Sequence, residues 1–392
     1  MFCICLIINN LPPPPIRTSA KLLGDGWTEK MFKWYQVTIE QENKLGCFDQ
    51  DYLEWAHANG FYAESACSYN LTPDHIEDYL SDYNYLKVWP LNSWTRIWVN
   101  DKLTLKYMLA NTEFDKFMPE YYYYSTPQGL KSLIDNPYKE ASNENFIRLL
   151  TEKESFACKP CNGTTAIGFV KLSYKNGEFF QNKEIVSKEK IVDFVHKHPN
   201  YVFTEYLKPS KEFAQYSKLI HTLRIVTLNA NGIARIAGGY LRLPTAETGE
   251  ANYLVLNDNG TEKYNFLVNI DLDKGVYDGG KRIFINRTES CIKHPDSGEI
   301  IKGIISNYEA LKETILSIAN RFNTLEWLGF DIGVTDKGFK CMEINTHPGI
   351  KYMQILRPFL IDDFLKEYFS RKIWEVDKLT DVEKQVRFKI VR

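Results

Sequence analysis

Runs of strand-forming residues, bounded by turn residues, dominate the chain after residue 155. The expected strands cover 155–160, 165–174, 201–207, 222–243, 253–270 and a hairpin within 328–349. Apolar residues spaced three to four positions apart predict helices over 187–197, 304–323 and 358–370. Antiparallel strands with helices packed on them predict the α+β fold class.

The part before residue 155 is mostly helical in pattern. Helices are predicted over 49–61, over 72–83, where a Thr-Pro pair supplies cap and first residue, and over 100–114. The tyrosine-rich run 118–125 predicts a strand. We divide the chain into four parts: a poorly ordered leader (1–30), a helical N-terminal region (31–95) and two α+β subdomains (96–206 and 207–392).

The N-terminal "MFCICLIINNLPPPP" contains an apolar run of seven residues with no basic residue before it. It is too short for a signal peptide or a membrane span, and Met31 is an alternative first residue. No later run approaches the roughly 18 apolar residues of a transmembrane helix, so we expect no membrane span.

The amino-acid composition and the net charge limit the classes of function that this chain can have. With 44% hydrophobic and 25% charged residues and a net charge of −2, the chain fits a soluble protein without a large nucleic-acid-binding surface. Its 8 cysteines are scattered, which suits a reducing cytoplasm. Cys158 and Cys161 form a C-x-x-C, but no second pair completes a zinc site.

The stretch "LGFDIGVTDKGFKCMEINTHPG" places polar residues within an apolar hairpin. A loop of residues 336–338 brings Asp331 opposite Glu343, and the period-two alternation puts Asn345 on the same face. Phe330, Ile332, Val334, Met342 and Ile344 form the other face.

Two carboxylates directly across a ladder repel each other, so this face favours a bound cation. Hard oxygen ligands that leave room for water and phosphate are typical of Mg²⁺. Taken alone, the same pattern also fits a solvated strand face.

Three other stretches carry candidate chemistry. Lys159 ends a strand before a loop with Gly163, Thr164 and Gly168, whose backbone N–H groups can cradle phosphate, although a plain turn fits as well. "YVFTEYL" ends in Glu205, Tyr206 and Leu207, which can hydrogen-bond an adenine edge, with Glu212 placed to reach ribose. Arg224 and Arg242 lie in apolar strands and predict paired carboxylate or phosphate. His347 either lies beside the metal face or caps the turn at Pro348-Gly349.

In chain order, Lys102 in an "NDK" helix start, Lys159 before its loop, "TEYL", the strand arginines and "GFD…MEINTHPG" resemble the ATP-grasp superfamily over about 96–350. "LNSWTRIWVNDKLTLKYML", "HTLRIVTL" and "NFLVNIDLDKGV" are most similar to sugar-transfer-associated and TupA-like ATP-grasp proteins of bacterial surface polysaccharide synthesis.

The resemblance implies two α+β subdomains that clasp ATP between antiparallel sheets, with 96–206 as the nucleotide lid and 207–392 carrying the catalytic hairpin. Lys102 and Lys159 then match phosphate-contacting lysines, and Glu205 and Leu207 match the adenine hinge. Asp331, Glu343 and Asn345 match the positions of the Mg²⁺ ligands, and the resemblance implies two ions.

The implied activity is ATP-dependent joining of a carboxylate to an amine through an acyl phosphate, with a sugar acid or amino acid as substrate. An ATP-grasp kinase or a nucleotide-binding module without turnover would use the same residues. Gly329 stands two positions before Asp331, where some such ligases carry an arginine; Arg224 or Arg242 is expected to replace it. Partners expected are a small or sugar-linked substrate, and a homodimer or association with glycan-synthesis enzymes.

Overall fold

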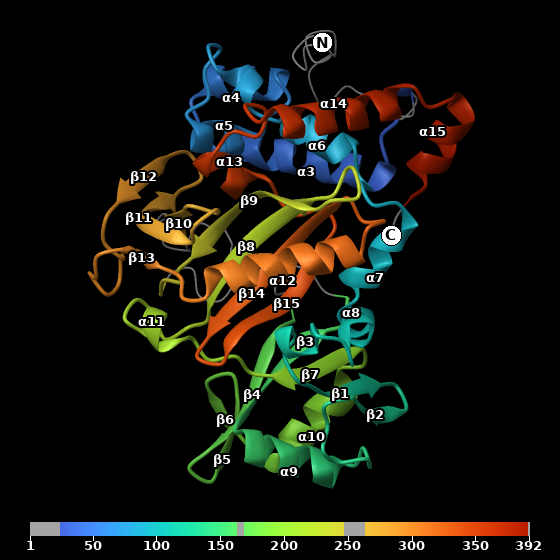
Figure 1. Cartoon of the computed structure of the whole chain (residues 1–392), viewed down its shortest axis with the longest axis vertical. Coiled ribbons are helices and arrows are strands. Elements are labelled where there is room, and N and C mark those ends of the chain that lie inside the picture. The colour runs from blue at the N-terminus through green and yellow to red at the C-terminus, as the bar shows by residue number, and fades with distance from the viewer. Residues whose placement is uncertain (1–23, 163–167, 247–262, 391–392) are drawn as a thin grey trace.

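The computed structural model describes residues 24–162, 168–246 and 263–390 (Figure 1). Most of the expected leader, together with Gly163 and Thr164, lies outside the described residues. Trp27 is fully buried and helix α3 begins at Glu29, so the last residues of the expected leader belong to the folded helical region. The predicted domain limits otherwise stay predictions.

The first sheet has seven antiparallel strands in the order β2-β1-β7-β3-β4-β5-β6. Its strands are β1 (Tyr121–Thr126), β2 (Gly129–Ser132), β3 (Ser155–Pro160), β4 (Val170–Lys175), β5 (Glu178–Gln181), β6 (Glu184–Val186) and β7 (Tyr201–Glu205). Helices α9 (Asn143–Lys153) and α10 (Lys188–Lys197) pack on it around a core that includes Phe146, Phe156 and Phe203 (Figure 1). This sheet lies within residues 96–206, and its role as a nucleotide lid stays a prediction.

The second sheet has eight strands in the order β12-β11-β10-β9-β8-β14-β15, with β13 paired to β11. They are β8 (His221–Leu228), β9 (Arg235–Arg242), β10 (Asn265–Ile270), β11 (Val276–Ile283), β12 (Thr288–Cys291), β13 (Lys302–Ile304), β14 (Trp327–Thr335) and β15 (Gly338–Asn345). Helix α12 (Tyr308–Arg321) packs on one face, where Ile225, Phe330 and Ile332 belong to the same core as Ile315.

The other face of this sheet packs at one end against the N- and C-terminal helices (Figure 1). These are α3 (Glu29–Leu45), α4 (Gln50–Ala58), α5 (Ala63–Tyr69), α6 (Asp82–Lys87), α13 (Lys351–Leu356), α14 (Asp363–Asp377) and α15 (Asp381–Phe388). Short helices α7 (Ile97–Asn100) and α8 (Lys102–Leu109) follow the N-terminal helices, and α11 (Lys211–Ala214) follows the crossing between the sheets. Helices of the two termini thus form one layer above the second sheet.

The predicted helix over 72–83 is wrong. Within that range only a 3-10 turn, Ile76–Asp78, forms before α6 begins at Asp82. The amide side chain of Gln354 accepts a hydrogen bond from Leu80 N at 2.9 Å and donates one to Leu80 O at 2.9 Å. Because both backbone groups of Leu80 are bound by a residue of α13, they cannot join a helical ladder.

The predicted facing of Asp331 and Glu343 is present, but the structure reaches it differently. Thr335 pairs with Gly338, so the loop has two residues instead of the expected three. A β-bulge then inserts Met342 between the pairs Ile332–Cys341 and Asp331–Glu343. Cys341 is fully buried in the core at the place expected for Met342. Without the bulge, the two-residue loop would place Glu343 on the core face.

Candidate active site

The candidate metal face lies on β14 and β15, on the side of the sheet opposite α12. Asp331 and Glu343 are directly paired, and Asn345 pairs with Gly329. Asn345 Nδ2 donates to Asp331 Oδ2 at 3.0 Å and to Glu343 Oε1 at 3.2 Å. The hairpin therefore brings together all three residues expected as metal ligands.

Arg224 comes from β8, directly opposite Asp331 on the other side of β14. Its Nε donates to Asp331 Oδ1, and its Nη2 donates to Asp331 Oδ2 at 2.7 Å. A Cβ at position 329 would stand 2.6 Å from Pro348 Cβ and 3.6 Å from Arg224 Nη1. Gly329 thus leaves room for Pro348 and for the guanidinium of Arg224 to lie over it. That either Arg224 or Arg242 replaces the missing arginine stays a prediction.

Lys102 approaches the same face from the start of α8. Its side chain is 7% exposed, and Nζ lies 3.4 Å from Glu343 Oε2. Asp101 caps the helix by accepting from Thr104 N at 2.7 Å, and Lys102 N donates to Cys161 O at 3.2 Å. The helix start is therefore anchored to the end of β3, which carries Lys159.

Burial and neighbouring charges shift the pKa values of the two carboxyls in opposite directions. Burial, opposed by Arg224 and reinforced by Glu343, raises the pKa of Asp331 to about 7. Burial also acts upward on Glu343, but the nearby Lys102 ammonium and hydrogen bonds outweigh it and lower that pKa to about 2. Burial alone would lower the pKa of Arg224, yet Asp331 raises it above its ordinary value, so Arg224 stays charged. A divalent cation between the carboxyls would favour the ionised form of both.

The donor set fits Mg²⁺. No group of three or more His, Cys, Asp or Glu side chains within the described ranges is arranged to hold a metal ion. The candidate site instead combines two carboxylates with one amide, all hard oxygen ligands on adjacent strands. Rotating the Asn345 amide by half a turn exchanges its nitrogen and oxygen and turns the oxygen toward both carboxylates.

The base end of the candidate site lies where β7 leaves the first sheet. Leu207 Cδ1 lies 3.1 Å from where a Cβ of Gly333 on β14 would stand, so this glycine lets the hinge pack against the metal hairpin. Lys171 Nζ lies 4.0 Å from the centre of the Tyr206 ring. Lys159, on β3, pairs with Val202 of β7 and is half-buried. These residues lie on or beside the first sheet, as expected for a nucleotide lid.

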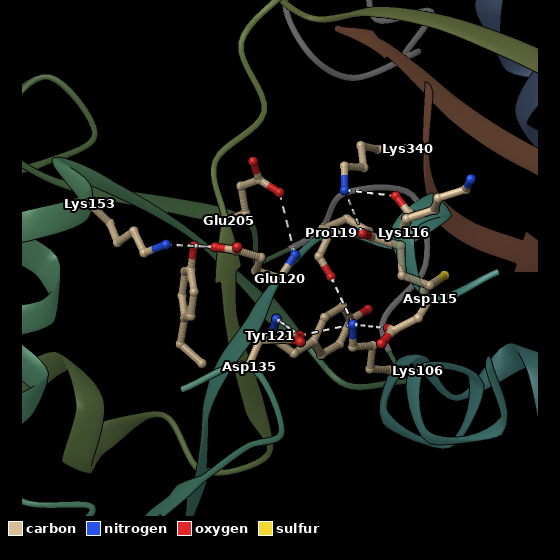
Figure 2. Close-up of polar contacts among 12 residues, drawn as sticks. Lys106, Asp115, Lys116, Pro119, Glu120, Tyr121, Asp135, Lys153, Glu205 and Lys340 are labelled. Carbon is tan, nitrogen blue, oxygen red and sulfur yellow. Dashed lines mark hydrogen bonds and ion pairs between the residues drawn. The ribbon is translucent and has the colours of Figure 1, made fainter. Parts of the chain in front are cut away.

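Polar contacts join this base end to the metal hairpin (Figure 2). Lys340, on β15, donates from Nζ to the carbonyls of Lys116 and Met118, each at 2.9 Å. Glu205 Oε2 accepts from Glu120 N at 3.4 Å (Figure 2). Its Oε1 lies 3.9 Å from Lys337 Nζ. The segment between α8 and β1 is thus tied to both halves of the site.

Three further residues were expected in the site: Arg242, Glu212 and His347. The structure places each of them differently. Arg242 is buried and pairs with Thr222, so it lies on the metal face one strand beyond Arg224. Glu212 lies on α11, after the hinge. The imidazole of His347 stacks on Tyr85 with centroids 4.0 Å apart, and burial lowers its pKa to about 3. That geometry favours packing of the loop over acid–base chemistry for His347.

Sequence reasoning missed two kinds of residue. Lys340 and Lys171 were not identified from the sequence, and only alternation along β15 and β4 could have shown which face they occupy. Asn92 and Asn100, whose amides bond the residues around the hairpin ends, follow no periodic pattern.

The sequence of this chain matches a known protein family, and its fold is similar to several solved structures. The sequence matches the family described as "Sugar-transfer associated ATP-grasp" over residues 91–360, which is more than half of the chain. The chain belongs to this ATP-grasp family. The expected resemblance is therefore confirmed, as is the α+β fold class with its two antiparallel sheets. A search of curated proteins returns no match.

Several solved structures are similar to this ATP-grasp chain at low identity. A D-alanine–D-alanine ligase from Bacillus anthracis is 14% identical with a TM-score of 0.38, covering 74% of this chain and 69% of that one. D-alanyl-alanine synthetase A from Vibrio cholerae is 13% identical with a TM-score of 0.41, covering 74% and 67%. An L-amino acid ligase from Bacillus licheniformis is 10% identical with a TM-score of 0.34, covering 82% and 54%. We assign no residue role from these likenesses.

Among the described residues, every helix is too short or too polar to cross a membrane.

Proposed function

We propose that this ATP-grasp protein is an ADP-forming ligase that activates a carboxylate with ATP and joins it to an amine. The observation that carries the proposal is the metal face. Asp331, Glu343 and Asn345 lie together there, with Lys102 on one side and Arg224 on the other. A scaffold without turnover would have no use for two half-buried carboxylates that face each other directly across the hairpin, each beside a cation.

Asp331, Glu343 and Asn345 would hold Mg²⁺, in keeping with their oxygen ligands. When bound by these residues, Mg²⁺ would supply positive charge that offsets the charge of the transferring phosphoryl group.

The protein's own side chains position the nucleotide and neutralise the charge of its phosphates. Lys102 and Lys159 hold the phosphates, and Glu205 with Leu207 receives the adenine edge. Arg224, fixed in direction by its two hydrogen bonds to Asp331, stabilises the charge that gathers on the phosphoryl oxygens. Such positioning accounts for most of the catalysis in phosphoryl transfer.

The reaction proceeds in two steps. An oxygen of the substrate carboxylate attacks the γ-phosphorus, and the bond to the β–γ bridging oxygen breaks, which releases ADP and leaves an acyl phosphate. The amine nitrogen then attacks the acyl carbon, inorganic phosphate leaves, and the amine loses its proton. Arg242 lies on the same face one strand further and would bind an acidic group of the substrate.

The family's description favours a substrate of sugar-transfer chemistry. We therefore infer a sugar acid or amino acid used in surface polysaccharide synthesis. The six described cysteines are free thiols, in keeping with action in the cytoplasm, where ATP is supplied.

Phosphorus NMR with Mg-ATP and a pool of uronic acids, amino acids and nucleotide sugars tests the proposal. ADP and free phosphate that appear only when a carboxylate and an amine are both present would support the ligase. ADP with a new phosphoester or phosphoramidate resonance would show a kinase instead. Nucleotide binding without any turnover across the pool would favour the non-catalytic alternative.

A further inference from the structure

A single side chain of the N-terminal region binds both ends of the metal hairpin. Asn92 is 3% exposed. Its Nδ2 donates to Trp327 O at 2.6 Å and to Thr346 O at 3.1 Å, and its Oδ1 accepts from Trp327 N at 3.2 Å. Trp327 is the first residue of β14, and Thr346 directly follows the candidate ligand Asn345.

Neighbouring residues hold the same loop. Asn100 Oδ1 accepts from Thr346 N at 3.3 Å and from Thr346 Oγ1 at 3.0 Å. Tyr85 donates from its hydroxyl to Pro348 O at 2.5 Å and accepts from the indole Nε1 of Trp327 at 3.0 Å. The segment from Tyr85 to Asn100 therefore contacts the loop 346–348 at three points.

The position of β15 explains why such support is needed. It is the last strand of the described sheet, so it has a backbone partner only on the β14 side. Strand ends at a sheet edge open more readily than central strands. Asn345 is the last residue of β15, and a metal ligand must be held to about 0.5 Å.

We propose that Asn92 is a positioning residue that fixes the exit of β15 and so holds Asn345 and Glu343 in place for the metal-bound nucleotide. The inference rests on the function proposed above. An asparagine suits this place because its planar amide offers two donors and an acceptor, and all three are used here. Alanine removes every one of these contacts, and aspartate would face two carbonyls with a carboxylate.

The test is a Mg²⁺ titration of full-length protein with the non-hydrolysable analogue AMP-PNP, followed by calorimetry. In Asn92→Ala, the Mg²⁺ concentration for half-maximal binding should rise about 10-fold or more, as when the support of a metal ligand is removed. AMP-PNP affinity in EDTA should stay within about twofold, because the base contacts lie on the other sheet. A purely structural role would lower the melting temperature but leave the Mg²⁺ requirement unchanged.

Asn59→Ala is the matched control, since Asn59 is also in the N-terminal region but bonds only locally, to Trp55 O at 2.8 Å. It should behave as wild type. If Asn92→Ala does not fold, Asn100→Ala, which releases Thr346 alone, should show the same change to a smaller extent. A folded Asn92→Ala, or a folded Asn100→Ala in its place, with the wild-type Mg²⁺ requirement would overturn the inference.

Failure of the proposed function looks different. If the protein is a kinase, binding of AMP-PNP by the wild-type protein still depends on Mg²⁺, and the Asn92→Ala titration applies unchanged. If the protein holds no metal-bound nucleotide, the wild-type protein binds AMP-PNP with no dependence on Mg²⁺. In that case hydrogen exchange decides the claim that Asn92 fixes the strand exit. Amides of residues 341–346 should exchange faster in Asn92→Ala while those of 265–270, on β10, stay unchanged; equal exchange at 341–346 would contradict it.

Discussion

The two ends of the candidate nucleotide site are built from different kinds of contact. At the metal end the side chains of Arg224 and Asp331 are 16% and 17% exposed, and their ion pair is bidentate. At the base end the pair Lys337–Glu205 spans 3.9 Å with the lysine 82% exposed. Buried, hydrogen-bonded charges resist displacement, whereas exposed pairs contribute little.

This difference suits a protein that must fix chemistry at one end and admit a nucleotide at the other. The eight-stranded sheet carries the metal face on its last two strands, β14 and β15, which are supported by β8 and by the Asn92 contacts. The seven-stranded sheet is joined to it through the hinge after β7 and through Lys340. Changes at the metal end should therefore abolish turnover, and changes at the base end should mainly alter nucleotide affinity.

The largest effect is expected from Glu343→Gln. Loss of one metal-ligand charge should lower Mg²⁺-dependent ATP turnover by more than about 100-fold, beyond the loss typical of a supporting residue. The fold should persist, because the amide can replace the carboxylate in its hydrogen bond with Asn345. Steady-state turnover with circular dichroism checks this, with Glu154→Gln, an exposed glutamate, as control. Normal turnover in folded Glu343→Gln would remove the metal assignment.

A smaller effect, on binding, is expected from Lys159→Ala. Losing a charged contact to phosphate should weaken ATP affinity by roughly 10- to 100-fold. Calorimetry measures the change, and Lys175→Ala, at the exposed end of β4, serves as control. Equal affinities in the two variants would place the phosphates elsewhere.

Lys340→Met sharpens the comparison further. It removes the two hydrogen bonds from Lys340 Nζ to the carbonyls of Lys116 and Met118 while keeping most of the length of the unbranched side chain (Figure 2). ATP affinity should fall about fivefold, which corresponds to one modest hydrogen bond. The Mg²⁺ requirement should not change, because the metal ligands keep their partners. A rise in the Mg²⁺ requirement equal to that in Asn92→Ala would erase the proposed distinction between the two ends.

The smallest effect is expected from Lys208→Ala. Its ion pair with Glu154 joins side chains that are 71% and 68% exposed, at the hinge and before β3. The free energy of unfolding should change by no more than about 0.5 kcal/mol. Urea denaturation tests this, and a larger loss would mean that the exposed pairs hold the lid more firmly than their geometry indicates.

Local patterns predicted the elements that carry the site. Strand alternation and the Gly338 turn predicted a hairpin with Asp331 facing Glu343, and the structure has that pair. The predicted loop length was wrong by one residue, and the bulge at Met342 compensates for it. The alternation of apolar and polar residues cannot reveal a β-bulge. The predicted pair therefore forms, although the loop length and the register of β15 differ from the prediction.

Contacts between distant segments were not predictable in this way. Leu80 leaves the expected helix because Gln354 binds its backbone. Asn92 reaches Trp327 and Thr346 only because the terminal helices form one layer above the sheet. Propensity and periodicity describe neighbours along the chain, whereas these residues are placed by tertiary packing.

Mn²⁺ binding followed by electron paramagnetic resonance, in the presence of AMP-PNP, tests most directly whether the β14–β15 face holds the metal-bound nucleotide. Wild-type protein should bind the ion, and the double variant Asp331→Asn with Glu343→Gln, shown to be folded by circular dichroism, should lose it. A folded double variant that binds Mn²⁺ and AMP-PNP as tightly as wild type would contradict the account.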